Sequence, residues 1–177
     1  GPFQIRKSSP DYAVLALEQA LPDYAADPAN PPRLRITKRF LFGPAPKGCE
    51  VSCDVEISLS KTLSRPLHFG IESVINFLAP ADSDRFFETP EGPQNLRFSG
   101  TLAGPLLHME DGWQRIRASL HAPASSEFWV APIETVSESE GGFERVYQGS
   151  QILAVWRPDL TVHPSFSSRL LWRMESF

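Results

Sequence analysis

Several features that mark common protein classes are scarce or missing in this sequence of 177 residues. It has two cysteines, and no apolar run approaches the ~18 residues that a membrane-spanning helix needs. The formal net charge is −4, and the 17 lysines and arginines form no basic stripe. This balance argues against nucleic acid and anionic membranes as partners. We therefore expect a soluble protein, with the cytoplasm as the favoured compartment.

Motifs for nucleotide binding, metal binding and nucleophilic catalysis are also missing. There is no glycine-rich phosphate loop, no HExxH or HxH pair and no GxSxG elbow, and the four histidines stand singly. Cys49 and Cys53 would lie about 13 Å apart in a strand, too far for a disulfide, so we interpret both as small buried apolar residues. Calcium binds oxygen-rich loops, but no EF-hand spacing occurs. The sequence predicts no metal or other cofactor.

Aromatic residues and prolines are plentiful. Twelve Phe, four Trp and three Tyr supply enough apolar surface for a core, and the length suits a single domain. Seventeen prolines interrupt the chain so often that a helical bundle is excluded. The Gly1-Pro2 start resembles the remnant left by a tag-removing protease. Residues 3–177 are therefore interpreted as one domain taken from a longer chain.

Alternation of apolar and polar residues predicts β-strands. From Val51 to Ser60 every odd position is apolar and every even position is polar, which indicates a strand with one buried face. A strand over 34–42 and the loop 43–48 complete a hairpin. Further strands are predicted at 67–78 (with a close backbone approach or a bulge at Gly70), 94–102, 113–121, 126–132, 143–156 and 166–174.

The remaining segments are less regular. Residues 11–21 fit either a helix or a strand, while the proline-containing segments 22–32 and 79–93 are predicted to be loops. Many short strands joined by turns rich in proline and glycine are typical of a sandwich of two sheets. The sequence therefore predicts an all-β, antiparallel β-sandwich.

Two kinds of residue are candidates for chemistry. Residues 134–140 hold the densest group of carboxylates, and alternation would place Glu134, Glu138 and Glu140 on one face. They could form an acid pair of the glycosidase type or simply a solvated surface. Exposed tryptophans serve as stacking platforms for sugars, and Trp113 and Trp129 are the candidates for this role. Trp156 and Trp172 lie in apolar alternation and are expected in the core.

One segment resembles a known family. The run EFWVAPIETVSESEGGFERVYQGSQILAVW at 127–156 is similar to the hallmark segment of the C-terminal domain of α-amylase/4-α-glucanotransferase proteins of glycoside hydrolase family 57. The shared features are the aromatic-Trp pair, the PIETVSxSE core, GFExVYQGS and a final Trp. RLRITKRFLF and LHFGIESVINFL resemble the family as well, so the resemblance extends from about residue 33 to 174.

This resemblance implies a galactose-mutarotase-like β-sandwich (a supersandwich) that accompanies a catalytic barrel in the same polypeptide. In that family the catalytic carboxylates belong to the barrel, so no catalytic residue is expected here. The expected function is a non-catalytic accessory domain that binds α-glucan as starch, glycogen or maltooligosaccharides. The residues assigned to sugar binding are Trp113, Trp129, Glu134, Glu140, Tyr147 and Gln148.

Two alternatives remain open. The domain could be purely structural and brace the catalytic barrel, in which case it would expose an apolar patch where the barrel packs. It could also be an independent enzyme of the mutarotase or hydrolase type, which would need a His–Glu pair lining one pocket.

Overall fold

The computed structural model describes residues 2–122, 127–139 and 142–177. Its one described helix is a short 3-10 helix, Pro22–Tyr24, and no helix in this part of the chain is long and apolar enough to cross a membrane. The strands are β1 (Gln4–Ser9), β2 (Tyr12–Ala20), β3 (Arg33–Ala45), β4 (Gly48–Leu59), β5 (Phe69–Ile75), β6 (Arg85–Glu88), β7 (Gln94–Asn95), β8 (Gly100–Ala103), β9 (Leu106–Asp111), β10 (Ile116–His121), β11 (Glu127–Ser139), β12 (Gly142–Trp156) and β13 (Ser165–Ser176).

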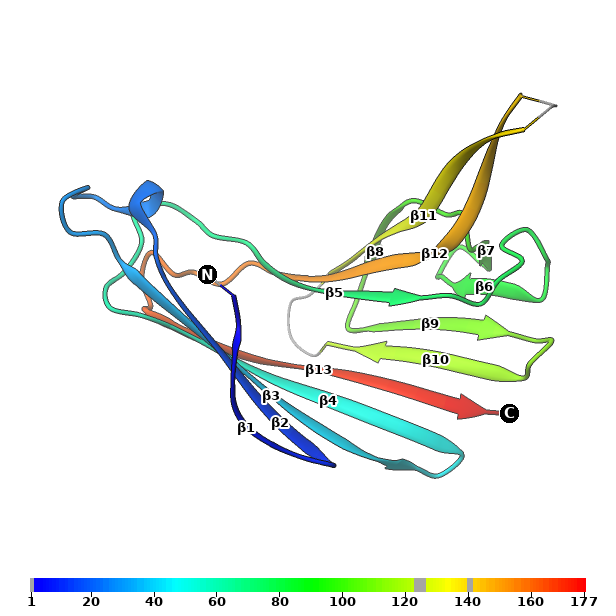
Figure 1. Cartoon of the computed structure of the whole chain (residues 1–177), viewed down its shortest axis with the longest axis horizontal. Helices are drawn as coiled ribbons and strands as arrows, with labels where there is room; N and C mark the ends of the chain where they lie inside the picture. Colours follow the sequence, from blue (N-terminus) through cyan, green and yellow to red (C-terminus); the bar gives the residue numbers. More distant parts are fainter. Residues whose placement is uncertain (1, 123–126, 140–141) are drawn as a thin grey trace.

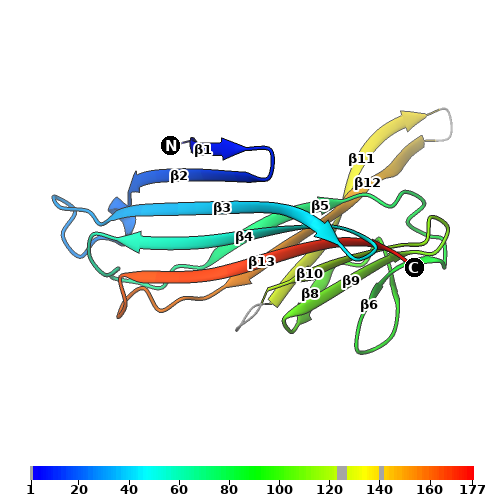
Figure 2. The same ribbon diagram turned by 90° about the horizontal axis from the view of Figure 1, so that it is seen from below.

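These strands form two antiparallel sheets, which confirms the predicted β-sandwich. The large sheet has the order β1-β2-β3-β4-β13-β10-β9-β6-β7, and the small sheet has the order β5-β12-β11-β8. Figure 1 shows the small sheet above one part of the large sheet, and Figure 2 shows β1 to β4 and β13 side by side. β1 forms one edge of the large sheet and contributes no buried residue.

The core lies between the sheets and follows the alternation of the sequence. On β4, Cys53, Val55 and Ile57 are buried while the residues between them are not. The neighbouring strands continue this face at two of the three positions, because Cys53 pairs with Phe40 and Leu170, and Ile57 pairs with Ile36 and Phe166. Trp156 is buried in the small sheet, and Trp172 packs against the core from β13. Both tryptophans therefore lie where the sequence places them.

The predicted hairpin over 34–60 is present, but its loop is shorter than predicted. β3 and β4 remain paired as far as Ala45 and Gly48, so the turn consists of two residues and not of the segment 43–48. Pro44 is tolerated in β3 because β2 pairs with β3 only as far as Leu41. Beyond that point β3 is an edge strand, where a missing N–H costs little.

Gly70 allows a close approach within the small sheet, as predicted. A Cβ at this position would lie 2.9 Å from Cδ1 of Leu153, on the neighbouring strand β12. A side chain at residue 70 would therefore displace Leu153. The strand itself is shorter than the predicted 67–78 segment.

The prediction of one continuous strand over 94–102 is wrong, because the chain turns after Asn95. The Asn95 side chain accepts the backbone N–H of Arg97 (2.9 Å), and the Asn95 carbonyl accepts that of Phe98 (3.0 Å). Asparagine favours such turns because its side chain competes for nearby backbone groups. The chain consequently leaves the large sheet after β7 and enters the small sheet at β8.

Other segments were ambiguous or missed. Residues 11–21 form the strand β2 and not a helix, because each residue of β2 pairs along β3. The predicted loop 79–93 contains β6, and β1 and β9 were not predicted. Every residue of β1 is exposed, and β6 has only four residues. Neither β1 nor β6 therefore has a long run of alternating apolar and polar residues.

The two cysteines differ in environment, contrary to the prediction that both are buried. Cys53 is buried in the core, whereas Cys49 is exposed near the β3–β4 turn. Burial raises the pKa of the Cys53 thiol to about 11, with Asp54 adding to this rise and Lys38 opposing it. The thiolate is the reactive form, so Cys53 is protected both by burial and by its pKa.

We therefore expect one fast-reacting thiol per native chain. Ellman's reagent at pH 8 should modify Cys49 quickly and Cys53 only after denaturation. Cys49→Ser should leave no fast-reacting thiol, while Cys53→Ser should leave one. Rapid modification of both thiols in the native protein would show that the core around Cys53 opens.

Candidate functional site

The residues predicted to bind sugar do not form one cluster. Trp113 lies in the turn between β9 and β10 of the large sheet, whereas Trp129 lies on β11 of the small sheet. Glu140 lies outside the described residues. The other three are near one another in the strand register, where the β11–β12 hairpin leaves the small sheet: Glu134, Tyr147 and Gln148.

Trp113 is the most exposed tryptophan, with 79% of its surface accessible. The turn that carries it is fixed by Asp111, whose side chain is fully buried. Asp111 Oδ1 accepts the backbone N–H of Gln114 (2.9 Å), and Oδ2 accepts Nε–H of Arg85 (3.2 Å). The turn therefore presents an apolar ring to solvent on a support that is held by a buried ion pair.

Further contacts hold the same turn. The Arg85 guanidinium also pairs with Asp82 (2.7 Å) and Asp84 (3.3 Å), and the backbone N–H of Gly112 donates to the Asp84 carbonyl (2.7 Å). Arg115 has a φ of 56°, which non-glycine residues rarely adopt. A turn held in this way has little conformational freedom left to lose.

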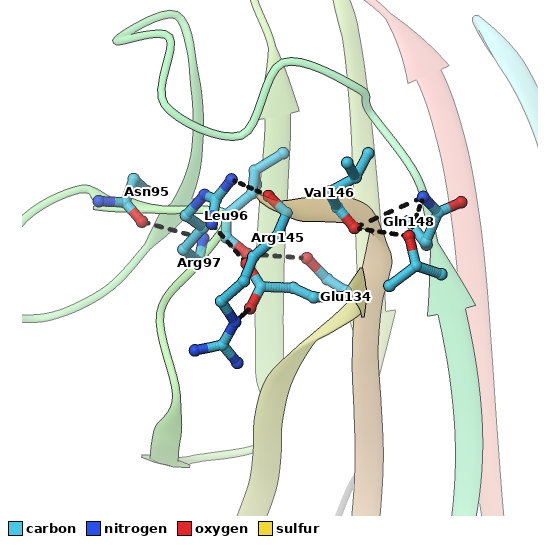
Figure 3. Close-up of polar contacts among 9 residues, drawn as sticks. Asn95, Leu96, Arg97, Glu134, Arg145, Val146 and Gln148 are labelled. Carbon is cyan, nitrogen blue, oxygen red and sulfur yellow. Dashed lines mark hydrogen bonds and ion pairs between the residues drawn. The ribbon is translucent and has the colours of Figure 1, made fainter. Parts of the chain in front are cut away.

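Glu134 forms a double ion pair at the base of the β11–β12 hairpin (Figure 3). Its Oε1 lies 2.5 Å from Nη1 of Arg97, and its Oε2 lies 2.9 Å from Nε of Arg145. The Glu134 side chain is almost completely buried, and Arg97 comes from the segment after β7. We call these three residues the clasp, because they join the hairpin to a distant part of the chain.

Tyr147 and Gln148 are engaged in contacts within the domain. The hydroxyl of the buried Tyr147 lies 2.7 Å from Oγ of Ser150, and Oγ of Ser150 lies 3.4 Å from the carbonyl oxygen of Leu96. Burial raises the pKa of Tyr147, and the Ser150 contact opposes this. The register of β11 and β12 shifts beside Glu134, which leaves Gln148 as the unpaired residue of a bulge. The side-chain Nε2 of Gln148 donates a hydrogen bond to Oγ1 of Thr135 (3.2 Å).

Trp129 lies on the outer face of the small sheet. Its neighbours Phe128 and Val130 are buried, whereas Trp129 is 40% exposed. Its Nε1–H donates to Oε1 of Glu127 (2.7 Å), which Arg157 also contacts. The Arg157 contact, together with that of Trp129, lowers the pKa of Glu127. Trp129 is thus accessible, but its polar edge already has a partner.

A hollow that the sequence did not predict lies on the outer face of the large sheet. It has a volume of about 330 Å³ and extends over β9, β10 and β13. His108 Nδ1 lies 2.8 Å from Oγ of Ser119 within it. Burial, aided by Arg117, lowers the pKa of His108. The polar lining and the two leucines beside it are His108, Arg117, Ser119, His121, Arg173, Glu175, Leu106 and Leu171.

A larger hollow of about 690 Å³ lies on the same sheet, over β3, β4 and β13. Polar side chains form most of its lining, together with Ile57 and Phe166, so this hollow offers several hydrogen-bonding groups. Alternation identifies this face as solvent-exposed but carries no signal for a hollow, because curvature of a sheet is not a local property. The side chains that line it include Arg35, Thr37, Arg39, Glu56, Ser58, Ser165 and Ser167.

The carboxylates on β11 are not arranged as a free acid pair. Glu134 and Glu138 occupy the same face of the strand, as alternation predicts, but both oxygens of Glu134 contact arginines. Among residues 2–122, 127–139 and 142–177, no group of three or more His, Cys, Asp or Glu side chains is placed to hold a metal ion.

Comparison with known proteins adds a family to this geometry. The profile described as "Alpha-amylase/4-alpha-glucanotransferase, C-terminal" matches residues 30–170, close to the range over which the sequence resembled it. Alpha-amylase 1 of Dictyoglomus thermophilum is 35% identical over 101 residues, which cover 54% of this chain and 14% of the amylase.

Two solved structures share the fold. The 4-alpha-glucanotransferase of Thermococcus litoralis matches 99% of this chain and 22% of its own, with a TM-score of 0.66 and 14% identity. The Slr1438 protein of Synechocystis sp. PCC 6803 matches 99% of this chain and 66% of its own, with a TM-score of 0.53 and 12% identity. The chain thus spans less than a quarter of the amylase and of the glucanotransferase.

Proposed function

Since this chain belongs to the alpha-amylase/4-alpha-glucanotransferase C-terminal family, we propose that it is a non-catalytic accessory domain that binds α-glucan. It would serve a catalytic domain of the same polypeptide that acts on starch, glycogen or maltooligosaccharides. The observation that carries the proposal is Trp113, an exposed ring on a turn held by the buried pair of Arg85 and Asp111.

The β9–β10 hairpin offers the two kinds of contact that a glucan needs. The C–H face of a glucose ring can stack on Trp113, while its hydroxyls need donors and acceptors. Arg117 lines the 330 Å³ hollow and lies on β10, two residues beyond the turn that carries Trp113. A maltooligosaccharide of several units would thus reach from the ring of Trp113 to the hollow.

Binding near a catalytic domain would raise the local concentration of substrate there. A single stacked ring contributes on the order of 1–3 kcal/mol, by analogy with stacking of nucleic-acid bases. We therefore expect weak to moderate affinity for the isolated domain. For Trp129, Glu134, Glu140, Tyr147 and Gln148, a role in sugar binding stays a prediction.

Titration calorimetry with maltoheptaose and pull-down on glycogen test the proposal. We expect the chain to bind both, and Trp113→Ala to weaken binding about tenfold or more because the stacking contact is lost. Trp129→Ala is the matched control, since it removes an exposed tryptophan from the other sheet. Cellohexaose, a β-linked glucan, is the control ligand.

Two results would contradict the proposal. Failure of the chain to bind any α-glucan at millimolar concentration would exclude glucan binding, and a loss of binding in Trp129→Ala alone would move the site to the small sheet.

His108, His121 and Glu175 also line one hollow, as a mutarotase-type enzyme would require. Acceleration of glucose mutarotation by the chain, lost in His108→Ala, would overturn the non-catalytic part.

A further inference from the structure

The outer part of the β11–β12 hairpin stands apart from both sheets (Figure 1). β8 pairs with β11 only as far as Val130, and β5 pairs with β12 only from Ser150 onward. Beyond the bulge, residues 134–139 and 142–147 pair with each other alone. We call these residues the arm. A two-stranded ribbon is marginally stable by itself, so an arm of this kind needs support.

The arm exposes apolar side chains on one face. In the rest of β11 and β12, the same face is buried in the core. The register places Val136 opposite Arg145 and Phe143 opposite Glu138, on the side that carries the buried Tyr147. Phe143 is 80% exposed and Val136 is 63% exposed. Contiguous exposed apolar residues rimmed by charges are typical of interaction surfaces.

The clasp fixes the base of the arm. Glu134 contacts both Arg97 and Arg145, and Arg97 Nη2 also donates to the carbonyl of Arg145 (3.5 Å). These contacts come from the segment after β7 and from both strands of the hairpin. The base of the arm is therefore positioned by contacts within this chain, which lowers the entropy lost when the arm docks.

We propose that the arm docks against the catalytic domain of the same polypeptide, with Phe143 and Val136 entering an apolar pocket. On this face Glu138 lies directly opposite Phe143, while Arg145, opposite Val136, is already paired with Glu134. The receiving surface should therefore carry a lysine or arginine beside the pocket for Phe143. This proposal does not depend on glucan binding, because none of these residues belongs to the β9–β10 hairpin.

The small size of the apolar surface favours an occupant within the same polypeptide. Phe143 and Val136 can bury a few hundred Å² at most, well below the roughly 800 Å² per partner of a stable complex between separate proteins. A covalently linked domain needs less area, because linkage supplies an effective concentration in the millimolar range. The amylase and the glucanotransferase that match this chain are several times longer than it, so such proteins contain a large remainder.

The test compares the 177-residue chain with the full-length protein that contains it. In the full-length protein, the double substitution Val136→Ser/Phe143→Ser should increase proteolytic cleavage between the domains about tenfold or more, because the docked state loses its apolar contact. In the isolated chain the same variant should keep its melting temperature, since both side chains are exposed. Val162→Ser is the matched control, because Val162 lies outside the arm and is as exposed as Val136.

A second variant and a size measurement complete the test. Glu138→Lys should also increase cleavage in the full-length protein, because it would place a positive charge against the basic residue beside the pocket. The proposal is overturned if the arm variants are cleaved like Val162→Ser, or if the serine variant destabilises the isolated chain. It is also overturned if the isolated chain forms a dimer that the serine variant dissociates, since the occupant would then be a second copy.

Discussion

Arg85→Met is expected to lower the melting temperature of the domain by roughly 6–20 °C. Methionine keeps much of the apolar stem of arginine and removes the guanidinium that pairs with Asp111. The Asp111 carboxylate is fully buried, and its remaining described donor is the backbone N–H of Gln114. A buried charge that has lost its counter-ion is strongly destabilising, whatever the net contribution of the intact pair.

Arg35→Met is the matched control for this experiment. Arg35 and Glu18 form an ion pair of 3.8 Å on neighbouring strands, and both side chains are largely exposed. Such pairs contribute little to stability. The melting temperature, measured by circular dichroism, should therefore change by no more than about 2 °C. If both variants melt alike, the Arg85–Asp111 pair does not hold the turn that carries Trp113.

Phe128→Ala should reduce the free energy of unfolding by about 3–5 kcal/mol. Phe128 is fully buried on the inner face of the small sheet, where its register partners are Leu102 of β8 and Ala154 of β12. Alanine would remove the ring and leave a cavity that two paired strands cannot close easily. Urea unfolding monitored by tryptophan fluorescence measures this loss.

The adjacent residue provides the control. Trp129→Ala removes a larger side chain, but from the outer face of the same strand, where it is 40% exposed. We expect a loss of about 1–2 kcal/mol, within the range of partly buried positions. A greater loss for Trp129→Ala than for Phe128→Ala would mean that the two faces of β11 are assigned the wrong way round.

The contrast between these neighbours shows what the sequence could predict. Alternation placed Cys53 in the core, and the observed burial of Phe128 and exposure of Trp129 follow the same period of two, because inward and outward positions alternate along any half-buried strand. Gly70 likewise marked a close approach, now seen against Leu153. These are properties of short segments. They can be inferred without knowing which strands are neighbours.

The contacts of the candidate sites could not be inferred in this way. Arg85 and Asp111 are 26 residues apart, and Arg97 and Glu134 are 37 residues apart. No local pattern distinguishes these charged residues from others on a solvated surface. The turn at Asn95 had a local signal in its residue type, but the apolar residues around it favoured a strand. The exposure of Cys49 depended on where the β3–β4 hairpin ends.

By itself the sequence determined an antiparallel β-sandwich, its alternating core residues and its resemblance to a family, because these depend on side-chain types at short spacings. The tertiary structure decided which side chains meet. It placed Trp113 on a turn held by a buried ion pair and used Glu134 to hold an arm. The physical reason is that ion pairs and sheet curvature depend on partners distant in sequence, which are brought together only when the strands pair.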